Sequence, residues 1–209
     1  MKITKYDQSC VVIEKEGRKM IIDPVEFVTK IPVTSDIDVV LVTHSHADHL
    51  TPDVLEEIIS KNPEVEILTT EDNMEIGATK SVKKGDEITI SKFDMKFFGE
   101  NHASIIPNNI PCENIGVVIN DTIIHPGDSF DTPPISKVKV LLPAISAPWL
   151  KTYEIMRYIN TIKPKKVVPV HDALLSDVGK TIYSNWLKKS CDEIDAEYRE
   201  LKPSESMEI

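Results

Sequence analysis

Short apolar runs rich in β-branched residues recur along the chain and predict β-strands in both halves of the sequence. Turn-forming pairs such as Glu16-Gly17 and Asn120-Asp121 separate some of these runs and indicate hairpins. The nearly continuous apolar run at 37–43 is typical of a strand that is covered on both faces. We expect strands within 1–10 and at 10–13, 19–22, 37–43, 65–68, 87–90, 95–98, 115–119, 122–124, 138–142, 166–170 and 197–201.

Apolar positions spaced three and four residues apart predict helices between these strands, near 73–79, 153–162 and 178–191. A further helix begins at Thr51-Pro52-Asp53, where Thr51 can cap the first turn and Pro52 suits its first position. Strands and helices in both halves predict an α/β fold, with either two sheets packed face to face or one doubly wound sheet. Since no linker or composition shift divides residues 1–209, we expect a single domain.

The composition is that of a globular protein with an acidic surface. Hydrophobic residues make up 41% of the chain, and 24 Lys and Arg against 34 Asp and Glu give a net charge of −10. An acidic surface repels phosphate backbones, so we expect no nucleic-acid partner. No apolar run approaches the ~18 residues of a membrane helix, and residues 1–10 lack the apolar core of a signal peptide. Cys10, Cys112 and Cys191 form no CxxC pair, which predicts mostly buried, reduced thiols in a cytoplasmic protein without a membrane partner.

Three of the six histidines crowd into the segment Thr43-His44-Ser45-His46-Ala47-Asp48-His49, where a buried strand ends and a capped helix begins. His44 and His46 alternate along an extended segment and therefore project to the same side, whereas Asp48 and His49 follow the turn of the chain. Imidazole nitrogens together with a carboxylate are the ligands of zinc and its neighbours. A loop that only capped the next helix would not need three histidines, so the segment predicts a metal site.

This segment resembles the HxHxDH motif of the metallo-β-lactamase superfamily. The other motifs of that family are matched in order, each after an expected strand, at Asn101-His102-Ala103, Pro126-Gly127-Asp128-Ser129 and Val170-His171-Asp172. The resemblance implies two divalent metal ions, one bound by His44, His46 and His102 and the other by Asp48, His49 and His171, with Asp128 bridging them. It also implies an αββα sandwich, in which two mixed sheets pack face to face with helices outside.

By the same resemblance the chain is a hydrolase in which a metal-bridging hydroxide attacks a small ester, lactone or phosphodiester. Asp48 is the residue expected to orient the hydroxide or to accept its proton. The metal is expected to be Zn²⁺, with Mn²⁺ or Fe²⁺ as alternatives. A non-hydrolytic di-iron protein that handles redox chemistry or oxygen would need the same ligands. We prefer the hydrolase because 209 residues leave little room for an electron-delivery domain.

Within the superfamily the chain is similar to the minimal branch near the L-ascorbate-6-phosphate lactonases, through the segments 5–10, 21–24 and 143–149. Asp48 stands where some lactamases have a metal-bound cysteine, and no cysteine is expected near the other ligands. His125 and Asp172 are expected to support ligands rather than to bind metal. Trp149 either stacks on the substrate or anchors its loop to the core. The expected partner is a small-molecule substrate, and the family allows a homo-oligomer.

Overall fold

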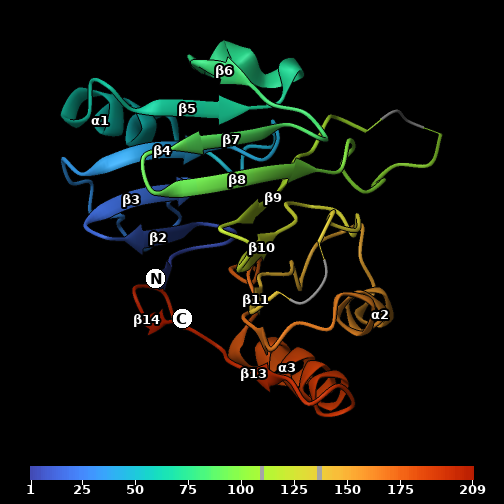
Figure 1. The fold of residues 1–209 in the computed structure, drawn as a ribbon. Coiled ribbons are helices and arrows are strands. Elements are labelled where there is room, and N and C mark those ends of the chain that lie inside the picture. The colour runs from blue at the N-terminus through green and yellow to red at the C-terminus, as the bar shows by residue number, and fades with distance from the viewer. Residues whose placement is uncertain (109–110, 136–137) are drawn as a thin grey trace.

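Two mixed β-sheets pack face to face in the computed structural model, which describes residues 1–108, 111–135 and 138–209 (Figure 1). The first sheet consists, in spatial order, of β14 (Ser206–Glu208), β1 (Lys2–Lys5), β2 (Val11–Lys15), β3 (Arg18–Ile22), β4 (Ile37–Leu41), β5 (Glu66–Thr69) and β6 (Lys80–Ser81). The second consists of β13 (Glu197–Tyr198), β12 (Lys166–Val167), β11 (Val140–Leu141), β10 (Ile123–His125), β9 (Gly116–Ile119), β8 (Phe93–Phe98) and β7 (Glu87–Ile90).

Helices lie on the outer faces of both sheets. The helix α1 (Pro52–Lys61) packs on the first sheet, and α2 (Thr152–Ile162) and α3 (Asp177–Asp192) pack on the second (Figure 1). A short 3₁₀ helix, η1 (Glu71–Ile76), precedes β6. The arrangement confirms the αββα sandwich and rules out a single doubly wound sheet. In the described ranges, none of the helices combines the length and the apolar character needed to cross a membrane.

Alternating side chains explain why the central strands are buried on both faces. Val11 and Ile13 of β2 lie in the core between the sheets, whereas Val12 lies in the core under α1. Likewise, Met20 of β3 lies in the core between the sheets and Ile21 lies in the core under α1. A strand that contributes to two cores needs apolar residues at every position, which is the continuous pattern in the sequence.

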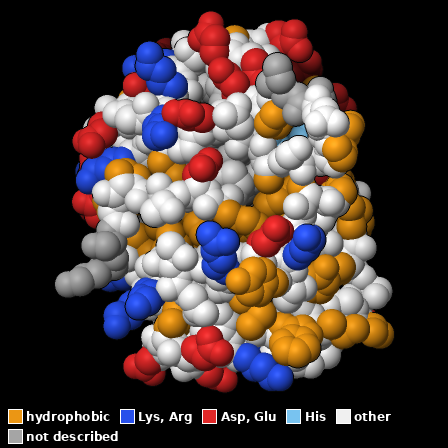
Figure 2. Space-filling view, turned by 90° about the vertical axis from the view of Figure 1, so that its right-hand side faces the viewer, with side chains coloured by type: hydrophobic (Ala, Val, Ile, Leu, Met, Phe, Trp, Pro, Cys, Tyr) orange, Lys and Arg blue, Asp and Glu red, His pale blue; other side chains and the backbone are white. Residues whose placement is uncertain are grey.

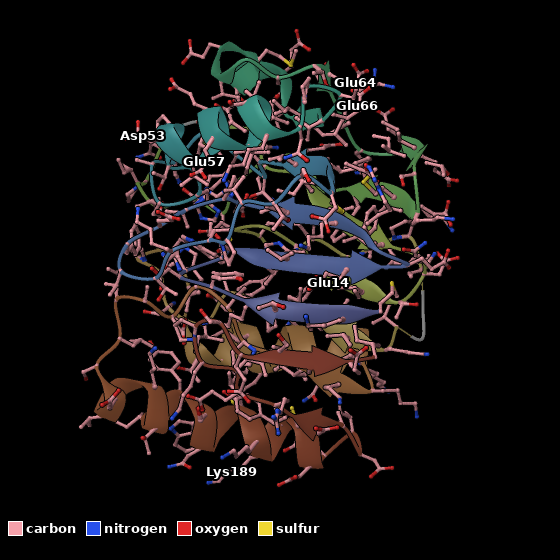
Figure 3. All side chains as sticks on the ribbon, turned by 90° about the vertical axis from the view of Figure 1, so that its left-hand side faces the viewer. Glu14, Asp53, Glu57, Glu64, Glu66 and Lys189 are labelled. Atoms are coloured by element: carbon pink, nitrogen blue, oxygen red, sulfur yellow. The ribbon has the colours of Figure 1, made fainter. Side chains whose placement is uncertain are left out.

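Acidic side chains gather on the outer side of the first sheet. Figure 3 shows Asp53 and Glu57 on the outside of α1 and Glu64 and Glu66 close to β5. Asp53, Glu57 and Glu64 are exposed, so part of the net negative charge lies on this face.

Several expected elements differ in extent. The strands expected at 138–142 and 166–170 shorten to β11 and β12, because beyond them only an isolated bridge joins Ala144 and Val170. The hydroxyl of Thr51 does not cap α1, since it accepts a hydrogen bond from the backbone of Glu26 at 2.9 Å. The short strands β6 and β14 were not predicted, because two or three residues carry no readable alternation.

The core between the sheets can be tested with two phenylalanines. Phe97 of β8 is 1% exposed, whereas Phe27 in the loop after β3 is 45% exposed. Because Phe97→Ala opens a cavity between the sheets, we expect it to lower the free energy of unfolding by about 3–5 kcal/mol. Phe27→Ala, the matched control, should cost less than about 1 kcal/mol. Guanidinium unfolding measures both, and equal losses would contradict this assignment of the core.

Candidate metal centre

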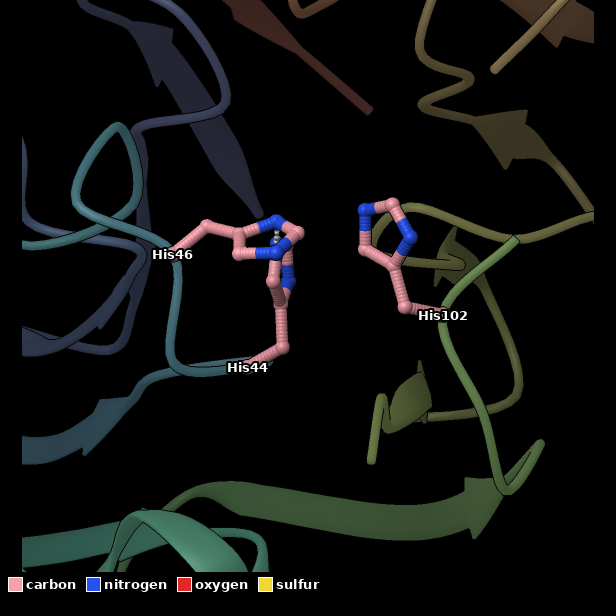
Figure 4. A group of neighbouring side chains, drawn as sticks. All are labelled: His44, His46 and His102. Carbon is pink, nitrogen blue, oxygen red and sulfur yellow. Dashed lines mark hydrogen bonds between the residues drawn. The ribbon is translucent and has the colours of Figure 1, made fainter. Parts of the chain in front are cut away.

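Seven donor side chains from both sheets meet at one edge of the sandwich. His44, His46, Asp48 and His49 lie in the loop between β4 and α1. The other three come from the second sheet, where His102 follows β8, Asp128 follows β10 and His171 follows β12. Figure 4 shows the rings of His44 and His46 next to each other, with the ring of His102 facing them from the other side of the centre. The sequence placed these residues after strands, and the structure brings them together in space.

The donors form two groups with Asp128 between them. Donor atoms lie within 4.8 Å of one another in the group His44, His46 and His102, and also in the group Asp48, His49 and His171. A third group, of His44, His49 and Asp128, overlaps both. The carboxylate oxygens of Asp128 lie 3.4 Å from Nε2 of His102, 3.6 Å from Nε2 of His49 and 3.2 Å from Nε2 of His171. The first two groups contain the same residues as the two sets that the motif resemblance implies, and the binding of an ion by each set stays a prediction.

Hydrogen bonds on the outer side of the rings aim their other nitrogens into the centre. Nδ1 of His171 donates to the backbone oxygen of Ser146 at 2.6 Å, and Nδ1 of His102 donates to that of Ala103. Because Nδ1 is the donor in each ring, the neutral form presents its lone pair at Nε2. Histidines that bind metals are commonly oriented in this way.

Asp23, at the end of β3, orients two more rings. Its carboxylate is fully buried and accepts hydrogen bonds from Nδ1 of His49 at 2.7 Å and from the hydroxyl of Thr43 at 2.9 Å. The Thr43 hydroxyl in turn lies 3.0 Å from Nδ1 of His44. Sequence reasoning missed this role, because Asp23 is separated from His49 by 26 positions and stands in an Asp-Pro pair that looked like the end of a strand.

Gln8 and His171 hold each other in place. The Gln8 amide donates to Oδ2 of Asp48 at 2.9 Å and lies 3.1 Å from both ring nitrogens of His171. The backbone N–H of His171 donates to the backbone oxygen of Gln8 at 2.8 Å. Both residues have a positive φ, 52° for Gln8 and 58° for His171, which is strained for residues with a side chain. Gln8 is therefore a positioning residue of the site that the sequence did not single out.

The turn before Asp128 requires glycine. Gly127 has a φ of 62°, and a Cβ atom there would overlap the side-chain oxygen of Asn114. That oxygen accepts the backbone N–H of Asp128 at 2.9 Å. On the other side, Nδ1 of His125 accepts the N–H of Gly127 at 3.2 Å, and Nε2 donates to the backbone of Ser9. His125 thus lies outside the donor groups and supports the turn.

Trp149 and Asp172 also lie outside the donor groups. The indole N–H of Trp149 donates to Oδ2 of Asp128 at 3.0 Å, and its ring packs against Phe130. This contact favours an anchoring role for Trp149 over stacking on a substrate. Asp172 forms a buried ion pair with Lys5 at 2.7 Å and a second one with Lys180. That pairing anchors the segment directly after His171.

Cys112 corrects one expectation. Its sulfur lies 3.8 Å from Nε2 of His46, so the prediction that no cysteine lies near the ligands is wrong. The two residues are 66 positions apart in the sequence, and the fold brings them together. The backbone N–H of His102 donates to the oxygen of Cys112 at 2.9 Å, which folds the segment after β8 back onto the centre. Cys10 and Cys191 are buried, as expected, whereas Cys112 is half-buried.

Three donor atoms in the centre are buried and have no hydrogen-bond partner among residues 1–108, 111–135 and 138–209, namely Nε2 of His49, Nε2 of His102 and Oδ1 of Asp128. Each unpaired buried polar atom costs about 1–3 kcal/mol, so three of them facing one another indicate that something binds between them. Imidazole nitrogens and carboxylate oxygens are the donors that divalent transition-metal ions take. The residues present therefore fit metal ions.

The charges of the centre shift its pKa values in opposite directions. Burial lowers the pKa of His44 well below its usual value. Burial also acts to lower the pKa of His171, but hydrogen bonds to Asp128 and Asp48 raise it to about 9. For Asp128 burial acts to raise the pKa, yet His49 and the other rings hold it well below its usual range. In the absence of metal, a proton on His171 therefore offsets part of the negative charge of these carboxylates.

Comparison with known proteins points to one family. The model of the beta-lactamase superfamily domain matches residues 2–171. The UPF0173 metal-dependent hydrolase of Carboxydothermus hydrogenoformans is 25% identical over 86% of this chain and 90% of its own length. Protein Rv0786c of Mycobacterium tuberculosis is 28% identical over 88% of this chain and 89% of its own.

Solved structures share the fold. The metallo-beta-lactamase fold protein YhfI of Bacillus subtilis superposes with a TM-score of 0.71 at 14% identity, over 99% of this chain and 98% of its own. CmlA, a diiron β-hydroxylase of Streptomyces venezuelae, superposes with a TM-score of 0.74 at 11% identity, over all of this chain but only 54% of its own. At these identities the similarity concerns the fold.

Metal binding should become tighter as the pH rises from about 7 to about 8.5, because imidazole binds metal only when it is neutral. Below its pKa of about 9, His171 carries a proton that the metal must displace. Each proton displaced strengthens binding by up to about tenfold per pH unit. Competition with a chelator, followed by calorimetry, measures the slope. His171→Gln should flatten it, and a wild-type affinity independent of pH would contradict the assignment.

Proposed function

The chain belongs to the metallo-β-lactamase superfamily of metal-dependent hydrolases, and from this premise we propose that it is a dinuclear hydrolase of a small ester, lactone or phosphodiester. The observation that carries the proposal is the set of unpaired donor atoms on both sides of Asp128. One shared carboxylate between two three-residue groups suits two ions rather than one. A single ion would leave the donors of the other group unpaired.

In this proposal His44, His46 and His102 hold one ion, Asp48, His49 and His171 hold the second, and Asp128 contacts both. Zinc is the metal that we propose, because five of the seven donors are imidazoles, and Mn²⁺ or Fe²⁺ are the alternatives. Bound divalent ions would supply a nucleophile at neutral pH, since they lower the pKa of water, and would polarise the oxygen of the substrate.

Asp48 differs from the other donors in a way that suits proton transfer. Its side chain is 36% exposed, whereas those of His171 and Asp128 are nearly buried. The hydrogen bond from Gln8 and the contact with His171 fix its Oδ2 atom. A carboxylate that is held on one side and open to solvent on the other can accept a proton from the attacking water and release it.

A di-iron protein that handles oxygen is the second candidate. The observation that favours it is the similarity of this fold to that of the diiron β-hydroxylase CmlA. About half of that chain lies outside the match, whereas the UPF0173 relative aligns over nearly its whole length. We therefore prefer the hydrolase. Two bound irons with a visible absorption band would favour the di-iron protein instead.

Asp128→Asn tests the shared carboxylate. After reconstitution with zinc, we expect about two equivalents in the wild type and one or fewer in the variant, because an amide is a poor bridging ligand. Asp53→Asn, which changes an exposed carboxylate of α1, is the control and should keep both ions. Elemental analysis gives the ratio. Two equivalents in Asp128→Asn would contradict the bridge, and none in the wild type would refute the proposal.

Asp48→Asn tests the proton acceptor. Asparagine keeps the size of the side chain but cannot accept the proton, so we expect kcat to fall by about 10²–10⁴-fold. The assays use 4-nitrophenyl acetate, γ-butyrolactone and bis(4-nitrophenyl) phosphate, with Asp53→Asn as the control. Unchanged turnover in Asp48→Asn would remove this residue from the reaction. Metal content, measured in parallel, separates loss of proton transfer from loss of an ion.

A further inference from the structure

We propose that a pocket beside the metal centre receives a short apolar group of the substrate, so that the protein acts on neutral esters or lactones rather than on phosphodiesters. The inference rests on the proposed function and narrows its substrate class. It is carried by the position, size and lining of the pocket.

The pocket adjoins the first donor group. It is lined by His46, His102, Ala103, Ser104, Ile105, Ile106, Pro111 and Cys112. Because His46 and His102 also belong to the donor group, a molecule whose reacting carbonyl lies at the metal centre can extend directly into the pocket. On the face shown in Figure 2, a histidine side chain is visible between hydrophobic ones.

The size of the pocket limits what it can hold. Its volume is about 130 Å³. A cavity of about 150 Å³ lined by aliphatic side chains accommodates one benzene ring. The pocket therefore fits a group of up to about six heavy atoms, such as a short acyl chain or a small ring.

The lining is mixed, and its apolar part (Ala103, Ile105, Ile106 and Pro111) can contact an apolar group of the substrate. Ile105 and Ile106 are 43% and 59% exposed, so a substrate that covers them removes aliphatic surface from water. The hydroxyl of Ser104 donates to the backbone oxygen of Ile106 at 3.2 Å, and this polar group is thus already paired within the loop. An apolar ligand consequently gains burial there without leaving that hydroxyl unpaired.

The charges disfavour a phosphodiester. Within the described part of the chain, no Lys or Arg lines the pocket. The Lys5 and Lys180 side chains near His171 are both paired with Asp172. With two divalent ions bound, a phosphodiester anion would be held by the ions alone, with no cationic side chain from these residues to bind its other oxygen. A neutral ester or lactone needs none.

Cys112 offers a direct test of occupancy that does not depend on turnover. It lines the pocket and is half-buried, whereas Cys10 and Cys191 are 0% and 1% exposed. The zinc-reconstituted protein is alkylated with iodoacetamide, and mass spectrometry follows the modification of Cys112. The probes are cyclopentanone, a neutral ring that cannot be hydrolysed, and dimethyl phosphate, an anion of similar size.

We expect saturating cyclopentanone to slow alkylation of Cys112 at least about fivefold and dimethyl phosphate to leave it unchanged. Protection by dimethyl phosphate alone, or by neither probe, would overturn the inference. The same assay on protein without zinc reports on the pocket even if no metal binds. Failure of the proposed function, seen as absent metal and absent hydrolysis, is therefore distinguishable from failure of the pocket assignment.

A substitution that fills the pocket tests chain-length selectivity. In the wild type, the two extra methylenes of 4-nitrophenyl butyrate should raise kcat/KM about tenfold over that of the acetate. Ala103→Leu should abolish or reverse this ratio, because the added side chain occupies the pocket. Val28→Leu enlarges a side chain that is 92% exposed and should leave the ratio as it is. An unchanged ratio in Ala103→Leu would overturn the assignment.

Discussion

The constraint that organises the site is a cluster of imidazole nitrogens and carboxylate oxygens that are buried against one another at a single edge of the sandwich. In the part of the chain that the structure describes, Nε2 of His49, Nε2 of His102 and Oδ1 of Asp128 have no hydrogen-bond partner, and they are buried from water. Such an arrangement costs free energy unless positive charge lies between the donors. In the metal-free protein, protons on His49 and His171 can supply part of that charge. Divalent ions bound between the donors would satisfy all of them at once, which is why we propose that the centre binds such ions.

The fold supplies the rigidity that this arrangement needs. The donors follow strands of both sheets, and the core between the sheets fixes those strand ends relative to one another. Three residues with positive φ lie here, namely Gln8, Asp23 and His171. Backbone of this kind costs about 1–3 kcal/mol per residue and persists only where the surroundings enforce it. Each of the three contacts another residue of the centre, so the strained backbone occurs where it positions the donor side chains.

The sequence predicted those parts of the metal centre whose residues lie close together along the chain. His44, His46, Asp48 and His49 lie within one strand-to-helix turn, and their spacing alone predicts a shared site. Short apolar runs rich in β-branched residues likewise predicted the longer strands. The roles of Asp23 and Cys112 were not predicted. Asp23 contacts His49 and Cys112 contacts His46 only through the tertiary fold, which the spacing of residues in the sequence does not show. The short strands β11 and β12 were overestimated for a related reason, since apolar runs continue beyond the point where sheet pairing ends.

The central claim is that two cations share Asp128. Anomalous diffraction at the zinc edge, from crystals grown with zinc, tests it most directly. The account predicts two peaks about 3.5–4 Å apart, one among His44, His46 and His102 and one among Asp48, His49 and His171. A single peak, or peaks only at exposed carboxylates such as those of α1, would contradict it.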